Sequence, residues 1–419
     1  MASVPSSSAE SWDGLSARLK GATALLTGLS CVAVLFSIAA SQTLLAAALL
    51  SLFLSRRSLE FPPRLAVPLL GFAGWTLLAV AFSSAPASGL PQVRKLFVFF
   101  TVLLVANAFQ RQKQIRWALH GMALAAAAAS VYGLAQFAAR YMELRRQALP
   151  FYENYVLHQI TGFMSHWMTF AGQLMLMLFL LCAVLLFAER TQAKRWGWLG
   201  VAIVGTALLA AFTRGIWLGT LAGLTYLLAS YRRWMLGLIP AALLVFYLIS
   251  PVWLQRRGSS IFQPEGDTST LSRVVMFRTG LGMIAAHPWF GVGPERVAVE
   301  FARYHPQGAD LPPAWYGHLH NSFLQVAAER GIPCLLLLLW IFFEVLRDNV
   351  RRARNATPNA RALSIAAVAA TIGMMVSGLF EHNFGDSEVL MLYLILISVP
   401  FAWEQTERRQ TPETPRSID

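Results

Sequence analysis

The stretch HLHNSFLQVAAERG, residues 318–331, holds the densest cluster of chemically capable side chains in an otherwise apolar chain. Asn321 or Ser322 can cap a short helix, because their side-chain oxygens accept hydrogen bonds from the first backbone N–H groups. Gly331 is a natural helix stop, and Pro333 suits the first turn of a following helix better than the middle of a continuous one. The sequence therefore predicts a short helix, a break, and then a membrane-spanning helix.

His320 falls at the start of that short helix, where backbone N–H groups and the helix dipole favour an anion. A histidine beside an anion site can serve as a general base. His318 and His320 also suggest a metal pair, but residues two apart point in different directions on a helix, and neither an HExxH motif nor a cysteine partner accompanies them. We therefore expect no metal site and no cofactor, and we take His320 as the main catalytic candidate.

The composition around this stretch is that of a membrane protein. The chain has 419 residues, of which 56% are hydrophobic and only 13% charged, whereas about 25% is typical of soluble domains. Repeated apolar runs of roughly 17–25 residues predict a polytopic α-helical membrane protein. The net charge of +13 is distributed as membrane topology requires, so we expect no nucleic acid partner. Cys31, Cys182 and Cys334 lack paired spacing and are expected to be packing residues.

The apolar runs predict an all-α fold with about twelve transmembrane helices and a large helical loop before the last three. The loop contains an amphipathic helix from Leu271 to Ala286, so we expect an ordered cap at the membrane surface. The predicted spans fall at about 21–40, 41–54, 65–84, 95–110, 116–138, 161–188, 196–213, 214–230, 234–254, 331–347, 361–381 and 386–403. The chain divides into a cytosolic N-terminal tail (1–20), nine spans (21–254), the outer loop (255–330), three spans (331–403) and a cytosolic C-terminal tail (404–419).

The sidedness follows from the Lys and Arg residues, most of which fall on one side of the predicted spans. Short loops on that side carry basic pairs such as Arg56-Arg57 and Arg351-Arg352, as the positive-inside rule requires. Both termini are therefore expected in the cytosol, with segments 139–160 and 255–330 on the outer side. The polar first 20 residues are expected to be a tail and not a removed signal peptide.

Three arginines on the outer side are candidates for binding an anion. Arg214 lies at a tight turn with Gly215, which leaves backbone room for a ligand, although a snorkelling arginine is the commoner explanation. On the loop helix, Arg273 and Phe277 share one face while Arg278 points elsewhere, and a solvated helix face is equally consistent with this spacing. Arginines from two segments could clamp a diphosphate bidentately.

Two further groups lie on the outer side. Arg140, Arg145 and Arg146 end the fifth span and either meet acidic groups of a substrate or serve a juxtamembrane structural role. The short loop between the last two spans either joins the same cavity or is a solvated turn; its polar residues are Glu381, His382, Asn383 and Asp386.

These residues resemble the motifs of the O-antigen ligase-like membrane proteins, a family of O-antigen ligases, O-antigen polymerases and protein O-oligosaccharyltransferases. His320-Asn321, nine residues and Gly331 resemble its signature, although Cys334 stands where the family usually has Gly, Thr or Tyr. The stretch FTRGIW (212–217) looks like its Ser-Arg-Gly segment, with Thr213 in place of the commoner serine. Ser272-Arg273, Phe277 and HPWFGVG (287–293) look like its loop helix and Pro-x-x-Gly-x-Gly turn.

The resemblance implies a metal-independent, inverting glycosyltransferase of the GT-C type in the bacterial inner membrane, with its active site facing the periplasm. It would transfer a glycan from undecaprenyl diphosphate; the length and single large loop most resemble the ligases of lipopolysaccharide biosynthesis, whose acceptor is a sugar of the lipid A core. The expected partners are these two substrates and membrane lipid, and we expect a monomer. The implied catalytic residues are His320, Arg214 and Arg273, and the implied substrate-binding residues also include Asn321, Arg278, Arg140, Arg145, Arg146 and Asp386.

Several alternatives stay open. Whether His320 takes the proton or positions the acceptor hydroxyl is undecided by the sequence. A polymerase would use a second lipid-linked glycan as acceptor, and a protein transferase would use a Ser or Thr hydroxyl. In a different class, a transporter could use the arginines to select an anionic substrate, but the spans lack charged residues in their interiors and show no inverted repeat.

Overall fold

The computed structural model describes residues 7–56, 58–189, 194–249, 255, 268–306, 308 and 317–410. All regular structure in these residues is helical, which confirms the all-α part of the predicted fold class. The predicted tails, the end of the ninth predicted span and parts of the outer loop lie outside the described residues. The α-helices are α1 (Ser7–Ala33), α2 (Ile38–Leu54), α3 (Pro63–Ala81), α4 (Leu90–Lys95), α5 (Phe100–Ala108), α6 (Gln112–Arg146), α7 (Phe151–Tyr155), α8 (Trp167–Phe187), α9 (Lys194–Ala210), α10 (Arg214–Tyr231), α11 (Leu238–Ile249), α13 (Thr268–Ala286), α14 (Val297–Tyr304), α15 (Ser322–Arg354), α16 (Pro358–Gly378) and α17 (Ser387–Gln410).

Seven helical segments among the described residues are long and apolar enough to cross a membrane. The chain is therefore an integral membrane protein, as its composition predicted. Two shorter apolar helices, Ile38–Leu54 and Arg195–Ala210, fall where further spans are predicted. The total of twelve spans stays a prediction. The seven segments are Pro63–Ala81, Pro86–Ala108, Gln112–Arg146, Trp167–Phe187, Ser322–Arg354, Pro358–Gly378 and Ser387–Gln410.

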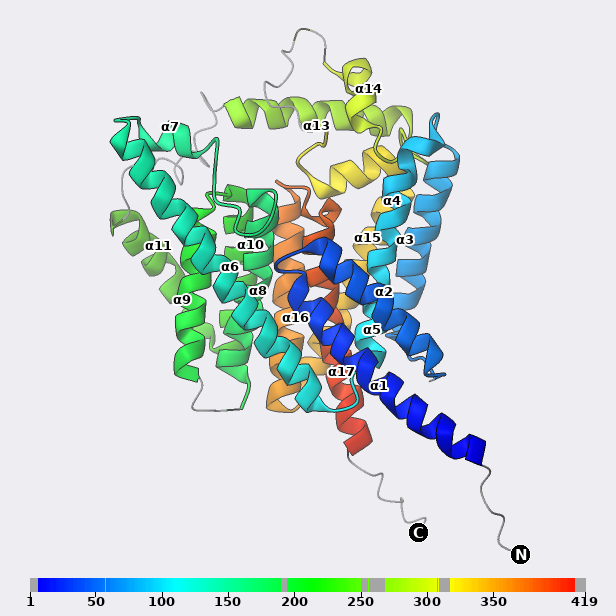
Figure 1. The fold of residues 1–419 in the computed structure, drawn as a ribbon. Coiled ribbons are helices and arrows are strands. Elements are labelled where there is room, and N and C mark those ends of the chain that lie inside the picture. Colours follow the sequence, from blue (N-terminus) through cyan, green and yellow to red (C-terminus); the bar gives the residue numbers. More distant parts are fainter. Residues whose placement is uncertain are drawn as a thin grey trace, which may run out of the picture.

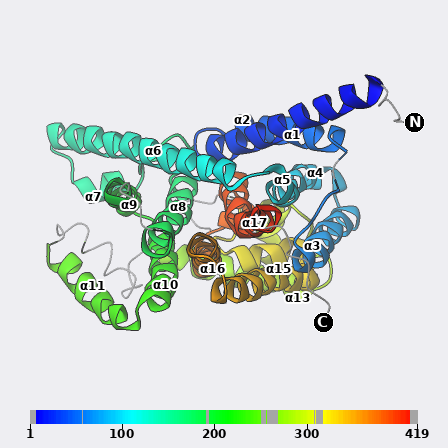
Figure 2. The same cartoon turned by 90° about the horizontal axis from the view of Figure 1, so that it is seen from below.

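The centre of the bundle is formed by α8, α16 and α17. Within their most apolar windows, 78% of the residues of α8 and α16 and 89% of those of α17 are buried, against 33% for the long helix α6. Viewed along the bundle, α16 and α17 lie inside a ring of the other helices, whereas α6 and α1 lie at its edge (Figure 2). Helices that are apolar all round suit a position surrounded by protein.

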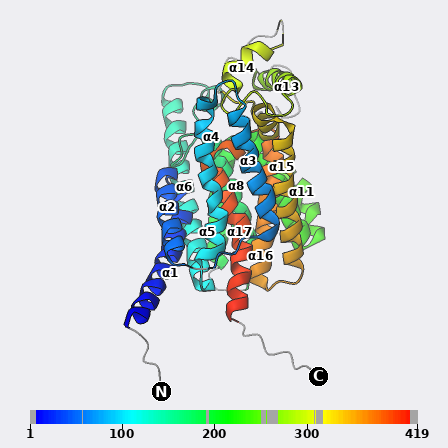
Figure 3. The same ribbon diagram turned by 90° about the vertical axis from the view of Figure 1, so that its right-hand side faces the viewer.

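The two ends of the bundle differ. The start of α1 and the end of α17 lie at one end, and α7, α13 and α14 lie at the other (Figures 1 and 3). The last turn of α15 carries Arg351, Arg352 and Arg354, and the last turn of α17 carries Arg408 and Arg409. The basic ends of α15 and α17 thus lie away from the cap formed by α13 and α14, whereas the basic end of α6 lies on the side of the cap, and the sidedness stays a prediction.

The break predicted at Gly331 is present in α15. Gly331 has φ 82° and ψ 169°, so the helix consists of a short segment from Ser322 and a long segment separated by a kink. Pro333 lies in the first turn of the long segment, where a missing backbone N–H costs little. The short helix, the break and the following span are therefore confirmed.

The kink is closed by the turn at residues 288–293. Its backbone supplies partners for the groups that the kink leaves unpaired: Ile332 N donates to Pro288 O over 2.8 Å, and Val292 N donates to Ala328 O over 2.8 Å. A Cβ at Gly331 would lie 1.9 Å from the carbonyl oxygen of Trp289, and one at Gly291 would lie 2.2 Å from the carbonyl carbon of Glu329. The turn at residues 288–293 and the kink at Gly331 thus pack against each other and form one junction.

The first connection differs slightly from expectation. The turn between α1 and α2 lies at residues 34–37, and not at the boundary between the predicted spans 21–40 and 41–54. The Ser37 side chain accepts a hydrogen bond from Ala40 N and so fixes the start of α2.

Candidate active site

A cavity of about 350 Å³ lies beneath α13, at the end of the bundle away from the start of α1. Its walls come from α10, α13, the residues just before α15 and the residues just after α16. A cavity of this size is within the range of small-ligand sites. Its lining residues are Arg214, Gly215, Leu218, Arg273, Val274, Phe277, Arg278, Leu319, His320, Asn321, Leu379 and Phe380.

Arg214 is the first residue of α10 and is 7% exposed. The turn before it is strained, since Phe212 has a φ of 53°. Tyr155 supports this turn from α7: its hydroxyl donates to Ala210 O over 2.6 Å, and its ring packs edge-on against Phe212 at 4.9 Å. Arg214 is therefore a buried wall residue of the cavity and not a cation that snorkels to the membrane surface.

The neighbouring glycine, Gly215, packs closely against the segment that follows α16. A Cβ at Gly215 would lie 2.8 Å from Phe380 Cβ and 3.1 Å from Glu381 Cγ. The space that the glycine leaves is thus filled by the segment that follows α16. Gly215 also lines the cavity, so the backbone room for a ligand stays a prediction, and its missing side chain lets Glu381 approach the start of α10.

Arg273 and Arg278 both line the cavity from α13. The prediction that Arg278 points elsewhere is wrong, because residues 273, 274, 277 and 278 form a single broad stripe on a helix, wide enough to cover the cavity. Nη2 of Arg273 donates to Glu381 Oε1 over 2.9 Å, and its side chain is 27% exposed. Arg278 is exposed at the rim.

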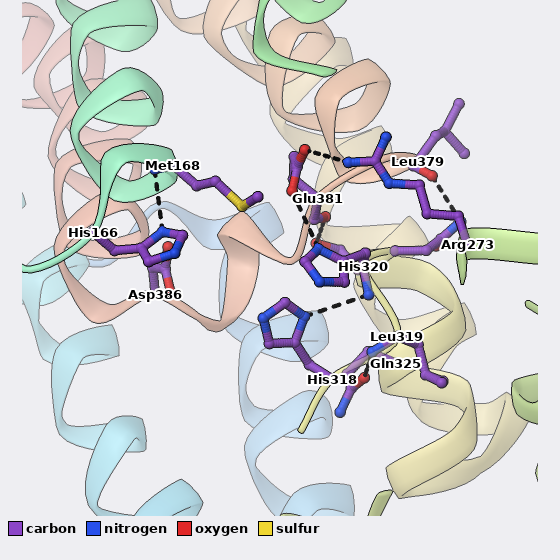
Figure 4. Close-up of polar contacts among 12 residues, drawn as sticks. His166, Met168, Arg273, His318, Leu319, His320, Gln325, Leu379, Glu381 and Asp386 are labelled. Atoms are coloured by element: carbon purple, nitrogen blue, oxygen red, sulfur yellow. Dashed lines mark hydrogen bonds and ion pairs between the residues drawn. The ribbon is translucent and has the colours of Figure 1, made fainter. Parts of the chain in front are cut away.

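Glu381 connects an arginine of the cavity with the histidine that is the candidate base. Its side chain is 1% exposed, and its two carboxylate oxygens contact Arg273 and Nδ1 of His320 (Figure 4). Burial raises the pKa of Glu381, but the hydrogen bond with His320 and the charge of Arg273 outweigh this and hold the pKa below its ordinary value. Glu381 is therefore an ionised, buried carboxylate. The alternative of a solvated turn at this position is wrong.

His320 has a left-handed backbone, with a φ of 48°, which is uncommon outside glycine and often marks functional sites. Its Nδ1 lies 3.5 Å from Glu381 Oε2, a long separation of the kind that tightens when substrate binds. His318 Nδ1 accepts from the backbone N of His320 over 3.4 Å, and the two rings lie 4.2 Å apart. Burial lowers the pKa of His318 to about 4, which keeps it a neutral acceptor that supports this turn.

Asn321 caps α15 and ties it to α16. Its Oδ1 accepts from the backbone N of Phe323 and of Leu324, and its Nδ2 donates to Leu379 O over 3.1 Å. The adjacent Ser322 hydroxyl donates to the backbone O of Glu381 over 3.0 Å. Of the two predicted caps Asn321 is the one used, and Ser322 holds the Glu381 backbone in place.

The other predicted site residues lie outside the cavity. Arg145 and Arg146 are exposed and Arg140 is half-buried at the end of α6, on the same end of the bundle as the site. Asp386 lies just before α17 and accepts a hydrogen bond from the Thr169 hydroxyl over 2.9 Å. The structure thus brings together Arg214, Arg273, Arg278, His320 and Asn321, and adds Glu381.

The side chains suit an anion held by cationic groups. Three guanidinium groups and one buried carboxylate give the cavity a positive balance. Among the residues that the structure describes, no group of three or more His, Cys, Asp and Glu side chains is arranged to hold a metal ion. Cys31, Cys182 and Cys334 are buried and free of disulfides.

Comparison with known families gives one match. Residues 199–339 match the family model described as O-antigen ligase. The matched region runs from α9 into the long segment of α15 and contains Arg214, Arg273 and His320. It supports membership of an O-antigen ligase-like family, whose members are glycosyltransferase-like enzymes. No curated protein matches the chain.

Proposed function

We propose that this chain, with its O-antigen ligase-like region at residues 199–339, is an O-antigen ligase. It is an inverting, metal-independent glycosyltransferase of the GT-C type, which transfers a glycan from undecaprenyl diphosphate to a sugar of the lipid A core. The observation that carries the proposal is the convergence of Arg214, Arg273, Arg278 and His320 on one cavity.

The arginines bind the diphosphate of the donor. A guanidinium group can hold two phosphate oxygens at once, which an ammonium group does less well. Arg214 approaches from the start of α10 and Arg273 from α13, so the two cations reach the diphosphate from different sides. They stabilise the charge that grows on the diphosphate as the glycosidic bond breaks, and this is what lowers the barrier.

Glu381 fixes the position of Arg273 before substrate arrives. The ion pair spans 2.9 Å and its carboxylate is 1% exposed, so little solvent screens it. Because the cations are set by protein contacts, they need not reorganise during the reaction. Preset guanidinium groups thus do the work for which other glycosyltransferases use a divalent ion.

His320 accepts the proton from the acceptor hydroxyl. With Nδ1–H directed at the Glu381 carboxylate, the lone pair that can take a proton is on Nε2. The acceptor oxygen attacks the anomeric carbon, the bond from that carbon to the phosphate oxygen breaks, and undecaprenyl diphosphate leaves. Attack from the side opposite the leaving group inverts the anomeric configuration.

The positive-inside rule supports our assignment of this chemistry to the periplasmic face of the inner membrane. The cavity lies at the end of the bundle opposite the start of α1 and the end of α17. The basic last turns of α15 and α17 mark the other end as cytosolic.

Reconstitution of the purified protein in nanodiscs tests the proposal. The substrates are an undecaprenyl-diphosphate-linked glycan and lipid A–core, and mass spectrometry identifies the product. Transfer to lipid A–core that survives rigorous chelation, with an inverted anomeric linkage, is the expected result. Elongation of a second lipid-linked glycan, glycosylation of a Ser/Thr peptide, or substrate flux without transfer would each assign the chain to a different function.

A further inference from the structure

We propose that the acceptor saccharide binds at a cluster formed by His166, Trp167 and Asp386, hereafter the acceptor cluster. It lies across the His320–Glu381 pair from the arginine-lined cavity. The inference rests on the proposed glycosyl transfer and adds to it a binding site for the second substrate. The ligand class is a neutral sugar ring with free hydroxyl groups.

The acceptor cluster and the arginines lie on opposite sides of the catalytic pair. Figure 4 shows His166 and Asp386 on one side of Glu381 and His320, and Arg273 on the other. Burial lowers the pKa of His166, the charge of Glu381 raises it and the charge of His320 lowers it, so the His166 ring interacts electrostatically with both members of the catalytic pair. Inverting attack needs this arrangement, because the acceptor oxygen must approach the anomeric carbon from the side away from the diphosphate.

The aromatic rings of the cluster are held in position by contacts within the protein. His166 is the N-cap of α8, and its Nδ1 accepts from Met168 N over 3.2 Å, which fixes the ring. The ring stacks on Trp167 with centroids 4.0 Å apart and an angle of 27°. Both residues are only half-buried. Burial lowers the pKa of His166, so the imidazole is neutral and can exchange hydrogen bonds with hydroxyl groups.

The polar part of the cluster is the carboxylate of Asp386. Asp386 accepts from the Thr169 hydroxyl over 2.9 Å and forms no salt bridge within the described part of the chain. Burial raises its pKa to about 6, so it is ionised near neutral pH and can accept hydrogen bonds from sugar hydroxyls. A carboxylate whose pKa is shifted by burial, beside a catalytic pair, is a functional candidate.

A buried donor lies on the same side of α8. The side-chain nitrogen of Asn383 has no hydrogen-bond partner within the described part of the chain, and the residue is 1% exposed. It lies 3.5 Å from where a Cβ at Gly172 would be, one helical turn beyond Thr169. An unsatisfied buried amide costs free energy unless a ligand or water supplies its partner. Within the acceptor cluster we assign this donor and the Asp386 acceptor to hydroxyl groups of the sugar.

Steady-state kinetics in nanodiscs test the inference, with the concentrations of lipid-linked glycan and of lipid A–core varied separately. Trp167→Ala and Asp386→Asn are expected to raise KM for lipid A–core by about tenfold, the effect of losing one hydrogen bond to a charged group or one stacking contact. KM for the donor should stay within about twofold of wild type. Arg278→Ala, on the diphosphate side, is the matched contrast. It should raise KM for the donor and leave KM for lipid A–core close to that of wild type.

Direct binding of lipid A–core to the purified protein without donor separates this inference from the proposed function. Weaker binding by Trp167→Ala and Asp386→Asn, with melting temperatures no lower than that of wild type, supports the acceptor cluster even if wild type transfers no glycan. Unchanged binding by both folded variants, absence of binding to wild type, or a selective rise in the donor KM overturns it.

Discussion

At the scale of single residues, the site depends on one carboxylate whose importance only the structure reveals. Glu381 contacts Arg273 and His320, and its neighbour Phe380 packs against the start of α10 at Gly215. The sequence places Glu381 in a short polar loop, where a solvated turn is an equally good interpretation. Pairing across 61 and 108 residues of chain is a tertiary property that local patterns cannot show.

Glu381→Gln keeps the shape of the side chain but removes the charge that holds Arg273 and orients His320. We expect kcat to fall by about 100-fold, the usual range for losing general-base function. Initial rates at saturating substrate, at matched protein levels, measure this. Glu143→Gln, at an exposed position near the end of α6, is the control and should match wild type. A Glu381→Gln variant with wild-type kcat would contradict the assigned role.

Arg214→Lys keeps the positive charge but loses the planar guanidinium group, which can donate to two oxygens at once. If Arg214 holds the diphosphate through two oxygens, kcat/KM should fall by about tenfold or more. Competition between wild type and variant for a lipid-linked glycan gives this ratio directly. Arg351→Lys, at the opposite end of the bundle, should have no effect. Full activity of Arg214→Lys would argue for a point charge in place of a bidentate contact.

At the scale of elements, the kink in α15 and the turn at 288–293 form one unit. Two glycines with positive φ, Gly291 and Gly331, let the two backbones pack against each other. This unit sets the direction of the short segment whose first turn carries His320 and Asn321. The sequence predicted the break from Gly331 and Pro333, but the partner of the break lies 40 residues earlier and is visible only in the fold.

Gly331→Ala tests this unit. The added Cβ would lie 1.9 Å from the Trp289 carbonyl oxygen at a φ of 82°, so the free energy of unfolding should fall by about 1–3 kcal/mol and transfer activity should be lost. Thermal melting in detergent measures the first effect. The control is Gly205→Ala in α9, where a Cβ meets nothing within 4 Å; it should be neutral or stabilising by up to about 1 kcal/mol. Equal melting of Gly331→Ala and wild type would contradict the packing described.

At the scale of the whole molecule, the sequence predicted the helical membrane fold, the convergence of Arg214, Arg273 and His320, and the short helix with its break. These follow from hydropathy, capping and motif spacing, which are local properties. It did not predict that Arg278 faces the cavity, since the direction of a helix face depends on where the helix docks. The resemblance also implied that Arg140, Arg145 and Arg146 bind substrate, but they lie apart from the cavity at the end of α6.

The stability of the whole protein should depend on pH through Asp386. Burial raises its pKa from 3.8 to about 6, opposed by the Thr169 hydrogen bond and Lys95 and aided by Glu388 and Glu381. A folded-state pKa above the unfolded value gives stability that is present at pH 4 and is lost as the pH rises through 6. Asp386→Asn removes this loss, so its melting temperature relative to wild type should increase between pH 4 and pH 7. A constant difference across that range would contradict the raised pKa.

The central claim is that His320 removes the acceptor proton in a cavity whose arginines hold the diphosphate. Its most direct test is the single-turnover rate of glycan transfer to lipid A–core by His320→Ala, with enzyme in excess over lipid-linked donor. His120→Ala, at an exposed histidine of α6, is the control. The account predicts a rate at least about 100-fold below wild type for His320→Ala, with donor binding retained, and a wild-type rate for the control. A wild-type rate in the folded His320→Ala variant would contradict it.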